Sequence, residues 1–231
     1  MNGYEKNIKD WEERFTVKQF LDSNNVSKED LNHLINLFEY IPIQQGIMNH
    51  FWLLLGPNDQ DFKTFMYENI CHTADKREHM YAISSAPYVF LSVIHEANCK
   101  KDKSLSNFDA ADKGQKLTNI GLHAGVILAE AIRMGYDVSQ VGCMEGKKGK
   151  TMSRRFSELV RKSLSETDKE NYFQNPDDAN TTKYTPILAI CIGEGLPLSE
   201  QFKTMVAGRP AVIGQKAKKL TKNITVRTPS E

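Results

Sequence analysis

Short runs of apolar residues mark the predicted strands of this chain. The three clearest runs are FWLLLG (51–56), PYVFLSVIH (87–95) and YTPILAICIG (184–193), and each is bounded by turn-forming residues. Continuous apolar runs of this length are typical of strands that are buried on both faces. We therefore expect these segments to be the inner strands of one sheet.

Apolar residues with helical spacing predict helices elsewhere. A first helix is expected over residues 4–13, and a second follows Ser27, which is a typical N-cap residue. The second helix carries its apolar residues on one face, at Leu31, Leu34, Ile35 and Phe38. This pattern predicts an amphipathic helix.

The segment 116–135 is apolar on nearly every side and contains many small residues: Gly121, Ala124, Gly125, Ala129 and Ala131. A helix that is hydrophobic all round is expected to be buried. Small residues also allow another backbone to approach closely. The pattern fits a central helix in the core of a dimer, and it also fits a core helix of a single chain.

Two segments depart from these patterns. Residues 147–183 are strongly polar, with one helix expected over Met152–Leu164, and we interpret them as an excursion from the core, either a lid or a mobile loop. Residues 195–231 form a tail without a regular pattern until NITVR, which is unusual unless the tail packs on another subunit. The simplest organisation is one domain over residues 1–231 that carries both segments.

The composition is that of an ordinary globular protein of 231 residues, 40% hydrophobic and 26% charged. Its 30 basic and 29 acidic residues give a net charge of +1, which provides no electrostatic footprint for nucleic acid or an anionic membrane. The N-terminus lacks the apolar core of a secretory signal, and no apolar run is long enough to span a bilayer. We expect a cytoplasmic protein that binds neither nucleic acid nor membrane.

Metal-binding chemistry is not indicated by the cysteines or the histidines. The four cysteines form no CxxC pair, and the six histidines form no HExxH motif. Closely spaced pairs are needed for the common structural and catalytic zinc sites. We therefore predict reduced thiols and no metal site.

The segment RFTVKQF (14–20) alternates polar and apolar residues. Side chains at every second position of an extended segment share one face, so Arg14, Thr16 and Lys18 would project together. Two cations around a hydroxyl group suit a phosphate. The alternative is the solvated face of a half-exposed strand, which needs no ligand.

A second phosphate motif is suggested by MEGKKGKT (144–151), which ends in Gly-Lys-Thr before a predicted helix. A P-loop requires Gly, four residues and then Gly-Lys-Ser/Thr, but the first position here is Met144. A P-loop nucleotide-binding protein is the alternative function to be tested.

Taken in order, several segments resemble the flavin-dependent nitroreductase family, and most closely its oxygen-insensitive NAD(P)H nitroreductases and dihydropteridine reductases. Residues 14–20 match the family's Arg-x-Ser/Thr-x-Lys/Arg-x-Phe pattern, and residues 112–137 are similar to its long central helix. The other matching segments are YIPIQQGIMNHFWLLL (40–55), VGCMEG (141–146), KYTPILAICIG (183–193) and KKLTKNITV (218–226).

The resemblance implies a set of residues that bind FMN. Arg14 and Thr16 would hold the FMN phosphate, and Lys18 would face the N1/O2 edge of the flavin ring. Lys219 would add a second phosphate contact, unless it is one of several solvated lysines. Gly146 would place its N–H near flavin N5, with Glu145 over the ring near the nicotinamide site; Gly146 could also be a simple turn residue.

The flavin-edge loop departs from the family pattern of Pro-Ser-Ser-x-Asn-x-Gln-Pro-Trp. Pro42 keeps the first proline, but Ile43 and Gln44 replace the two serines, and Gly46 replaces asparagine. Backbone contacts to the flavin from these four residues do not depend on their side chains. The change in side chains bears on the substrate class and on activity.

The resemblance implies an α+β fold with a mixed, mostly antiparallel sheet, helices on both sides and an intertwined homodimer with FMN at its interface. The implied activity is ping-pong hydride transfer from NAD(P)H through flavin N5 to a small-molecule acceptor such as a nitroaromatic or a quinone. The flavin carries the chemistry, so no catalytic side-chain acid or base is required. An FMN-binding protein without reductase turnover is a further alternative.

Overall fold

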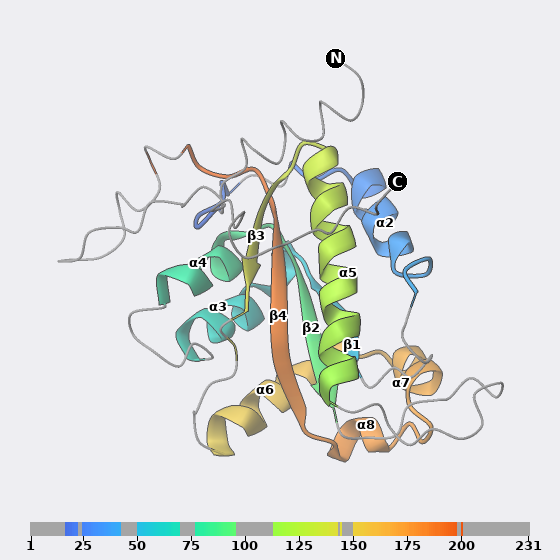
Figure 1. Ribbon diagram of the computed structural model, residues 1–231. Helices are drawn as coiled ribbons and strands as arrows, with labels where there is room; N and C mark the ends of the chain where they lie inside the picture. The colour runs from blue at the N-terminus through green and yellow to red at the C-terminus, as the bar shows by residue number, and fades with distance from the viewer. Residues whose placement is uncertain are drawn as a thin grey trace, which may run out of the picture.

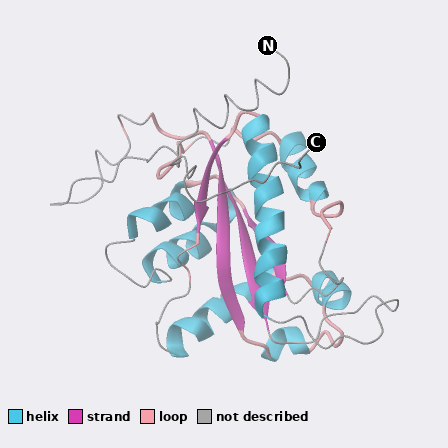
Figure 2. Cartoon of the chain, viewed as in Figure 1, coloured by secondary structure: helices cyan, strands magenta, loops and turns pink. Residues whose placement is uncertain are grey.

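A four-stranded antiparallel sheet lies at the centre of the structure, with helices on both of its faces (Figure 1, Figure 2). The computed structural model describes residues 17–22, 25–42, 50–69, 77–95, 113–142, 144, 150–197 and 200. Within these residues the strand order is β1-β2-β4-β3, and the strands are β1 (His50–Leu55), β2 (Tyr88–His95), β3 (Asp137–Val141) and β4 (Tyr184–Gly193).

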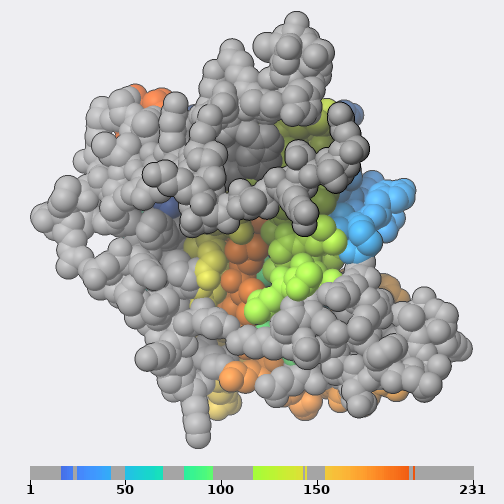
Figure 3. Space-filling view, viewed as in Figure 1, coloured from blue at the N-terminus to red at the C-terminus, as the bar shows by residue number. Residues whose placement is uncertain are grey.

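Helices α2 (Lys28–Leu37) and α5 (Lys113–Arg133) cover one face of the sheet, and they lie side by side at the surface in Figure 3. The opposite face packs against helices whose apolar residues form a second core cluster: α3 (Gln60–Asn69), α4 (Arg77–Ser85) and α6 (Lys150–Ser163). Three short helices complete the described fold: η2 (Pro57–Asp59), α7 (Glu166–Tyr172) and α8 (Asp178–Thr181).

The three strands predicted from continuous apolar runs are confirmed, and β2 and β4 are inner strands as predicted. The prediction of an inner position was wrong for β1, which lies at an edge of the described sheet with Trp52 and Leu54 only partly buried. In β2, Val89, Leu91 and Val93 enter the core on the α3/α4 side, while Phe90 enters the core under α5. The fourth strand, β3, was not predicted. Its sequence DVSQV contains polar residues at three of five positions and has no continuous apolar run.

The Ser92 hydroxyl forms hydrogen bonds between β2 and β4 at the point where the pairing register of the two strands shifts. The Oγ atom of Ser92 donates to the Leu188 carbonyl at 3.1 Å and accepts from the Leu188 N–H at 3.0 Å. Buried backbone groups need such partners. The central strand pair therefore continues through the irregularity.

Helix α2 is capped as predicted and is tied to α5 by polar contacts. The Ser27 hydroxyl accepts the Asp30 N–H at 3.0 Å, and the Tyr136 hydroxyl donates to the Asp30 carboxylate at 2.5 Å. Further along, Glu130 of α5 lies 2.6 Å from His33 of α2. These contacts fix α2 on the outer side of the sheet.

Replacement of Glu130 with Gln is expected to lower the free energy of unfolding by about 1–2 kcal/mol at pH 7, after allowance for solvent screening. Hydrogen bonds from Arg133, with a smaller contribution from His33, lower the pKa of Glu130 from 4.5 to about 2. A depressed carboxyl pKa stabilises the fold above pH 4.5, and this stabilisation disappears as the pH falls towards 2. Urea unfolding at pH 7, 5 and 3 measures the free energy of unfolding of the unaltered protein and of Glu130→Gln. The difference between the two free energies should shrink as the pH falls. A difference that stays constant would contradict this role of Glu130.

Helix α5 buries one side only within this chain. Ile120, Ile127 and Ala131 are buried, but Leu117 and Leu122 are 40% and 43% exposed. A Cβ atom added at Gly121 or Gly125 would meet nothing within 4 Å. Gly121 and Gly125 therefore face outwards, whereas Ala124 and Ala131 are buried against the sheet. No helix among the described residues is long and apolar enough to cross a membrane.

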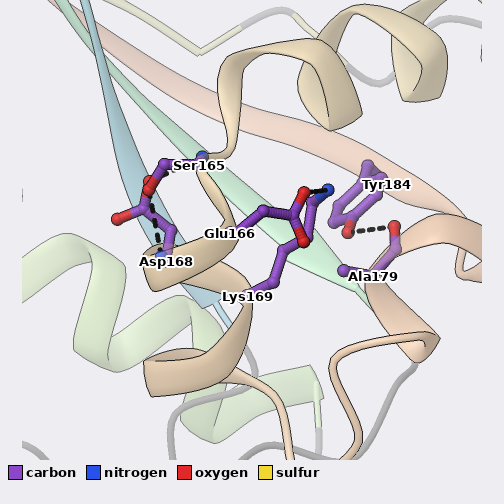
Figure 4. Close-up of polar contacts among 6 residues, drawn as sticks. All are labelled: Ser165, Glu166, Asp168, Lys169, Ala179 and Tyr184. Carbon is purple, nitrogen blue, oxygen red and sulfur yellow. Dashed lines mark hydrogen bonds and ion pairs between the residues drawn. The ribbon is translucent and has the colours of Figure 1, made fainter.

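The polar segment after residue 147 was predicted to leave the core, but several of its apolar side chains are buried in the core. Its buried side chains join the cluster on the α3/α4 side of the sheet: Phe156, Val160, Phe173 and Ala179. Figure 4 shows Ser165 and Asp168 capping α7 and the Tyr184 hydroxyl donating to the Ala179 carbonyl at 2.8 Å. A few apolar residues at helical spacing are sufficient to attach a mostly polar segment.

Candidate functional site

The segment 17–22, which carries Lys18, is fixed across the end of the sheet where β4 ends and β3 begins. The Val17 N–H donates to the Val138 carbonyl at 3.4 Å, and the Leu21 N–H donates to the Glu194 carbonyl at 2.8 Å. Phe20 forms an isolated antiparallel bridge with Gly195. These backbone contacts hold the position of Lys18 relative to the sheet.

Lys18 is buried, with only 7% of its surface exposed. The solvated strand face that the sequence left open is therefore wrong for this residue. Lys18 lies near Cys191 of β4: burial raises the pKa of the Cys191 thiol, and the charges of Lys63 and Lys18 oppose that rise. The thiol stays protonated at neutral pH, so it does not act as a nucleophile.

A second buried cation, Lys63 of α3, lies on the same side of the sheet. Its ammonium donates to the Ala86 carbonyl at 2.9 Å, just beyond the end of α4, and burial lowers its pKa. It lines a cavity of about 490 Å³ together with residues 19–22 and with Tyr81 and Ser85 of α4. A lysine bound to a carbonyl at a helix C-terminus is a stabilising arrangement in its own right.

Lys63 was not identified from the sequence, although a signal was present. It lies between Phe62 and Met66, which are both buried on the apolar face of α3. A lysine on the buried face of an amphipathic helix is unusual. Its helical position could have indicated a buried charge.

Pro42 is exposed and follows α2. Val17 and Phe20, which flank Lys18, belong to the core cluster that contains Cys191. In contrast, Leu34 and Phe38 of α2 pack with Phe90 and Ile190 in the cluster under α5. The structure therefore does not bring these two predicted site residues together within one chain.

The other predicted flavin-binding residues lie outside the described residues. They are Arg14, Thr16, Ile43, Gln44, Gly46, Glu145, Gly146 and Lys219. The first predicted helix, residues 4–13, lies outside as well. Lys18 is thus the predicted cation whose position can be assessed. A buried lysine on a segment fixed by backbone hydrogen bonds at the end of the sheet fits the role of a charge beside the electron-rich edge of a flavin.

A group of aromatic residues that the sequence did not single out lies between α2, α5 and β1. His123 of α5 is 2% exposed and its Nδ1 atom lies 3.4 Å from the indole Nε1 of Trp52 and 3.5 Å from Nε2 of His50. The Phe38 ring packs against both Trp52 and His123. Burial lowers the pKa of His123, so its imidazole is neutral at pH 7. The sequence signal was one histidine within an apolar helix.

A cavity of about 690 Å³ runs along β1 between α3 and α7. Phe62, Leu159 and Tyr172 are among the residues that line it. Neither Lys18 nor Pro42 lies in its wall. This cavity therefore does not combine the predicted flavin-binding residues.

The P-loop alternative is not supported by this geometry. Met144, which occupies the position of the motif's first glycine, is 2% exposed and belongs to the core. The preceding strand, β3, pairs antiparallel with β4. A phosphate-binding loop needs a glycine whose backbone can wrap the phosphates, and a buried methionine side chain does not provide this.

Comparison with known proteins gave matches among solved structures only. No protein-family model matches the sequence, and no curated protein matches it. A nitroreductase family protein from Clostridium novyi NT is 14% identical, with a TM-score of 0.54 over 84% of this chain and 87% of that chain. An FMN-dependent nitroreductase from Clostridium difficile R20291 is also 14% identical, with a TM-score of 0.51 over 87% and 99% of the two chains.

A third structure, nitroreductase A from Vibrio parahaemolyticus, is 13% identical, with a TM-score of 0.52 over 85% of this chain and 70% of that chain. At such low identity these matches establish the fold rather than the activity. The chain has the α+β fold of the nitroreductase family proteins, as its sequence motifs predicted.

Proposed function

We propose that this protein is an FMN-dependent oxidoreductase that uses NAD(P)H to reduce a small-molecule acceptor. The observation that carries the proposal is the burial of Lys18, at a position fixed by backbone hydrogen bonds, in a chain that has the nitroreductase fold. One of the similar structures is an FMN-dependent nitroreductase. Bound FMN would supply ping-pong hydride transfer between NAD(P)H and an acceptor such as a nitroaromatic or a quinone.

The residues of this chain would bind and orient the cofactor. Lys18 would place its positive charge at the N1/O2 edge of the ring, where reduction adds negative charge. Arg14, Thr16 and Lys219 would hold the phosphate, since cations and hydroxyl donors suit phosphate oxygens. Gly146 and Glu145 would lie near N5, and the backbone of residues 42–46 would contact the edge of the ring. These assignments remain proposals.

We further propose that the flavin site is completed by two chains. The residues that flank Lys18 and the helix that leads to Pro42 pack in core clusters on opposite faces of the sheet, which favours a flavin site shared between two chains. The exposed stripe of α5, with Leu117, Gly121, Leu122 and Gly125, offers a surface where a second backbone could approach closely. An intertwined homodimer would bring Lys18 of one chain near the 42–46 loop of the other.

The proposal is tested by an absorbance spectrum of the purified protein from 300 to 550 nm, before and after anaerobic NADH or NADPH. We expect flavin bands that bleach when the reductant is added. Bands that persist with both reductants would favour the alternative of FMN binding without turnover, which the replacement of the two family serines by Ile43 and Gln44 makes worth testing. The absence of bands, even after FMN is added, would overturn the proposal.

A further inference from the structure

Gly195, just beyond the end of β4, lies where three segments of the chain meet. Its N–H donates to the Asp137 Oδ2 atom at the start of β3, 2.8 Å away. Its two neighbours form backbone hydrogen bonds with segment 17–22, from the Leu21 N–H to the Glu194 carbonyl at 2.8 Å and from the Leu196 N–H to the Gln19 carbonyl at 3.0 Å. Residues 194–196 therefore join β3 to the segment that carries Lys18.

The close approach at this junction leaves no room for a side chain on residue 195. A Cβ atom added to Gly195 would lie 2.9 Å from both methyl groups of Val17 and 3.1 Å from the Asp137 carboxylate. Because the added atom would face the gap between the two methyl groups, every staggered rotamer of Val17 would leave at least one of them beside it. Val17 is also fully buried, so segment 17–22 would have to move to admit the new atom.

A movement of Val17 would be passed directly to Lys18, the next residue. The Val17 N–H donates to the Val138 carbonyl at 3.4 Å, which is already long for a hydrogen bond. A shift of a few tenths of an ångström away from β3 would break this contact. The position of Lys18 therefore depends on how closely residues 194–196 approach segment 17–22.

We propose that Gly195 is a positioning residue for Lys18: the absence of a side chain at 195 lets residues 194–196 hold segment 17–22 against β3, and so fixes Lys18 at its place in the flavin site. This inference rests on the proposed function, in which Lys18 faces the flavin. Gly195 acts through Lys18 and does not itself contact the cofactor.

Gly195→Ala is expected to weaken the binding of oxidised FMN about threefold and of reduced FMN about tenfold, since a small displacement of a charged group has large effects in a site of fixed geometry. The reduced flavin loses more because Lys18 faces the edge where reduction adds negative charge. The difference corresponds to a potential lower by about 15 mV for a two-electron couple. Flavin fluorescence titration and a dye-equilibrated redox titration measure both effects. A substitution that only destabilised the fold would leave the potential of bound FMN unchanged.

Val17→Ala supplies the compensating change, because it removes both methyl groups that the added Cβ atom would meet. In the Val17→Ala background, Gly195→Ala should have little further effect on FMN affinity or potential. Gly56→Ala is the matched control. A Cβ atom at Gly56 would meet its nearest neighbour, in the Tyr88 ring, at 3.6 Å, which is an ordinary contact. We expect this variant to bind FMN with unchanged affinity and potential.

Amide hydrogen exchange on the unaltered protein tests the junction without any substitution, and it stands even if Gly195→Ala does not fold. We expect the N–H groups of Leu21, Gly195 and Leu196 to exchange at least about 100-fold more slowly than in an unstructured chain. Exchange at the unstructured rate would overturn the proposal. A folded Gly195→Ala protein with unchanged FMN affinity and potential would also overturn it, as would equal effects with and without Val17→Ala. Absence of FMN binding by the unaltered protein would instead overturn the proposed function, and it is seen before any substitution is made.

Discussion

Replacing Lys18 with Met is expected to raise the dissociation constant of FMN about 10- to 100-fold, and to lower the reduction potential of bound FMN by about 30–60 mV. Methionine keeps the length and the apolar stem of lysine but removes the charge. Because Lys18 is 7% exposed, its charge acts in a partly desolvated site and is weakly screened by salt. Flavin fluorescence titration and a dye-equilibrated redox titration measure the two quantities.

Lys63 provides a matched control for this experiment. It is also a buried lysine on the same side of the sheet, but its ammonium binds the Ala86 carbonyl beyond the end of α4. Lys63→Met should therefore lower the free energy of unfolding by about 1–3 kcal/mol, as expected when a buried carbonyl loses its partner. It should leave the flavin potential unchanged. Equal effects of the two substitutions on FMN binding would show that Lys18 contributes only to folding.

Features of the fold that depend on local pattern could be predicted from the sequence. The strands β1, β2 and β4 follow from continuous apolar runs, and α2 follows from its apolar stripe and from Ser27 at its start. The strand β3 could not be found in this way, because DVSQV is short and half polar. Its pairing with β4 is decided by the tertiary fold, which supplies a partner strand that a local window does not contain.

The polar segment 150–183 shows the limit of composition as a guide. Its overall polarity suggested a loop, but burial depends on where the few apolar residues lie. Phe156 and Val160 are four residues apart on α6, so both face the sheet, while Arg154, Arg155 and Glu158 remain on the outside. Helical spacing, rather than average polarity, was the informative signal.

The candidate site was less predictable than the fold. The alternation in RFTVKQF drew attention to Lys18, but it could not distinguish a solvated face from a buried one. The burial of Lys18 depends on contacts with β3 and with the end of β4, which lie more than a hundred residues further along the chain and form backbone hydrogen bonds with segment 17–22. His123 was missed for a related reason: its burial and its contact with Trp52 depend on other elements of the fold, which a local window of sequence does not contain.

Replacing Gly121 with Arg is expected to abolish dimerisation and, with it, FMN binding, while the protomer keeps its fold. A Cβ atom added at position 121 meets nothing within 4 Å among the described residues, so the helix surface has room for the start of a side chain there. Arginine also favours a helix interior over glycine by about 0.5–1 kcal/mol. A bulky cation on the outward stripe of α5 would, however, prevent a second helix from approaching closely. Analytical ultracentrifugation measures dimerisation, FMN titration measures cofactor binding, and far-UV circular dichroism checks the fold of the protomer.

Gly121→Ala is the matched control, since it gives a similar gain in helix propensity but adds only one methyl group. We expect it to remain dimeric and to retain FMN. The coupling between assembly and cofactor follows from the positions of Lys18 and α2 on opposite faces of the sheet, which leave each chain with part of the site. A Gly121→Arg protein that is monomeric and still binds FMN with unchanged affinity would contradict the shared site. One that remains a dimer would instead exclude this stripe of α5 from the interface.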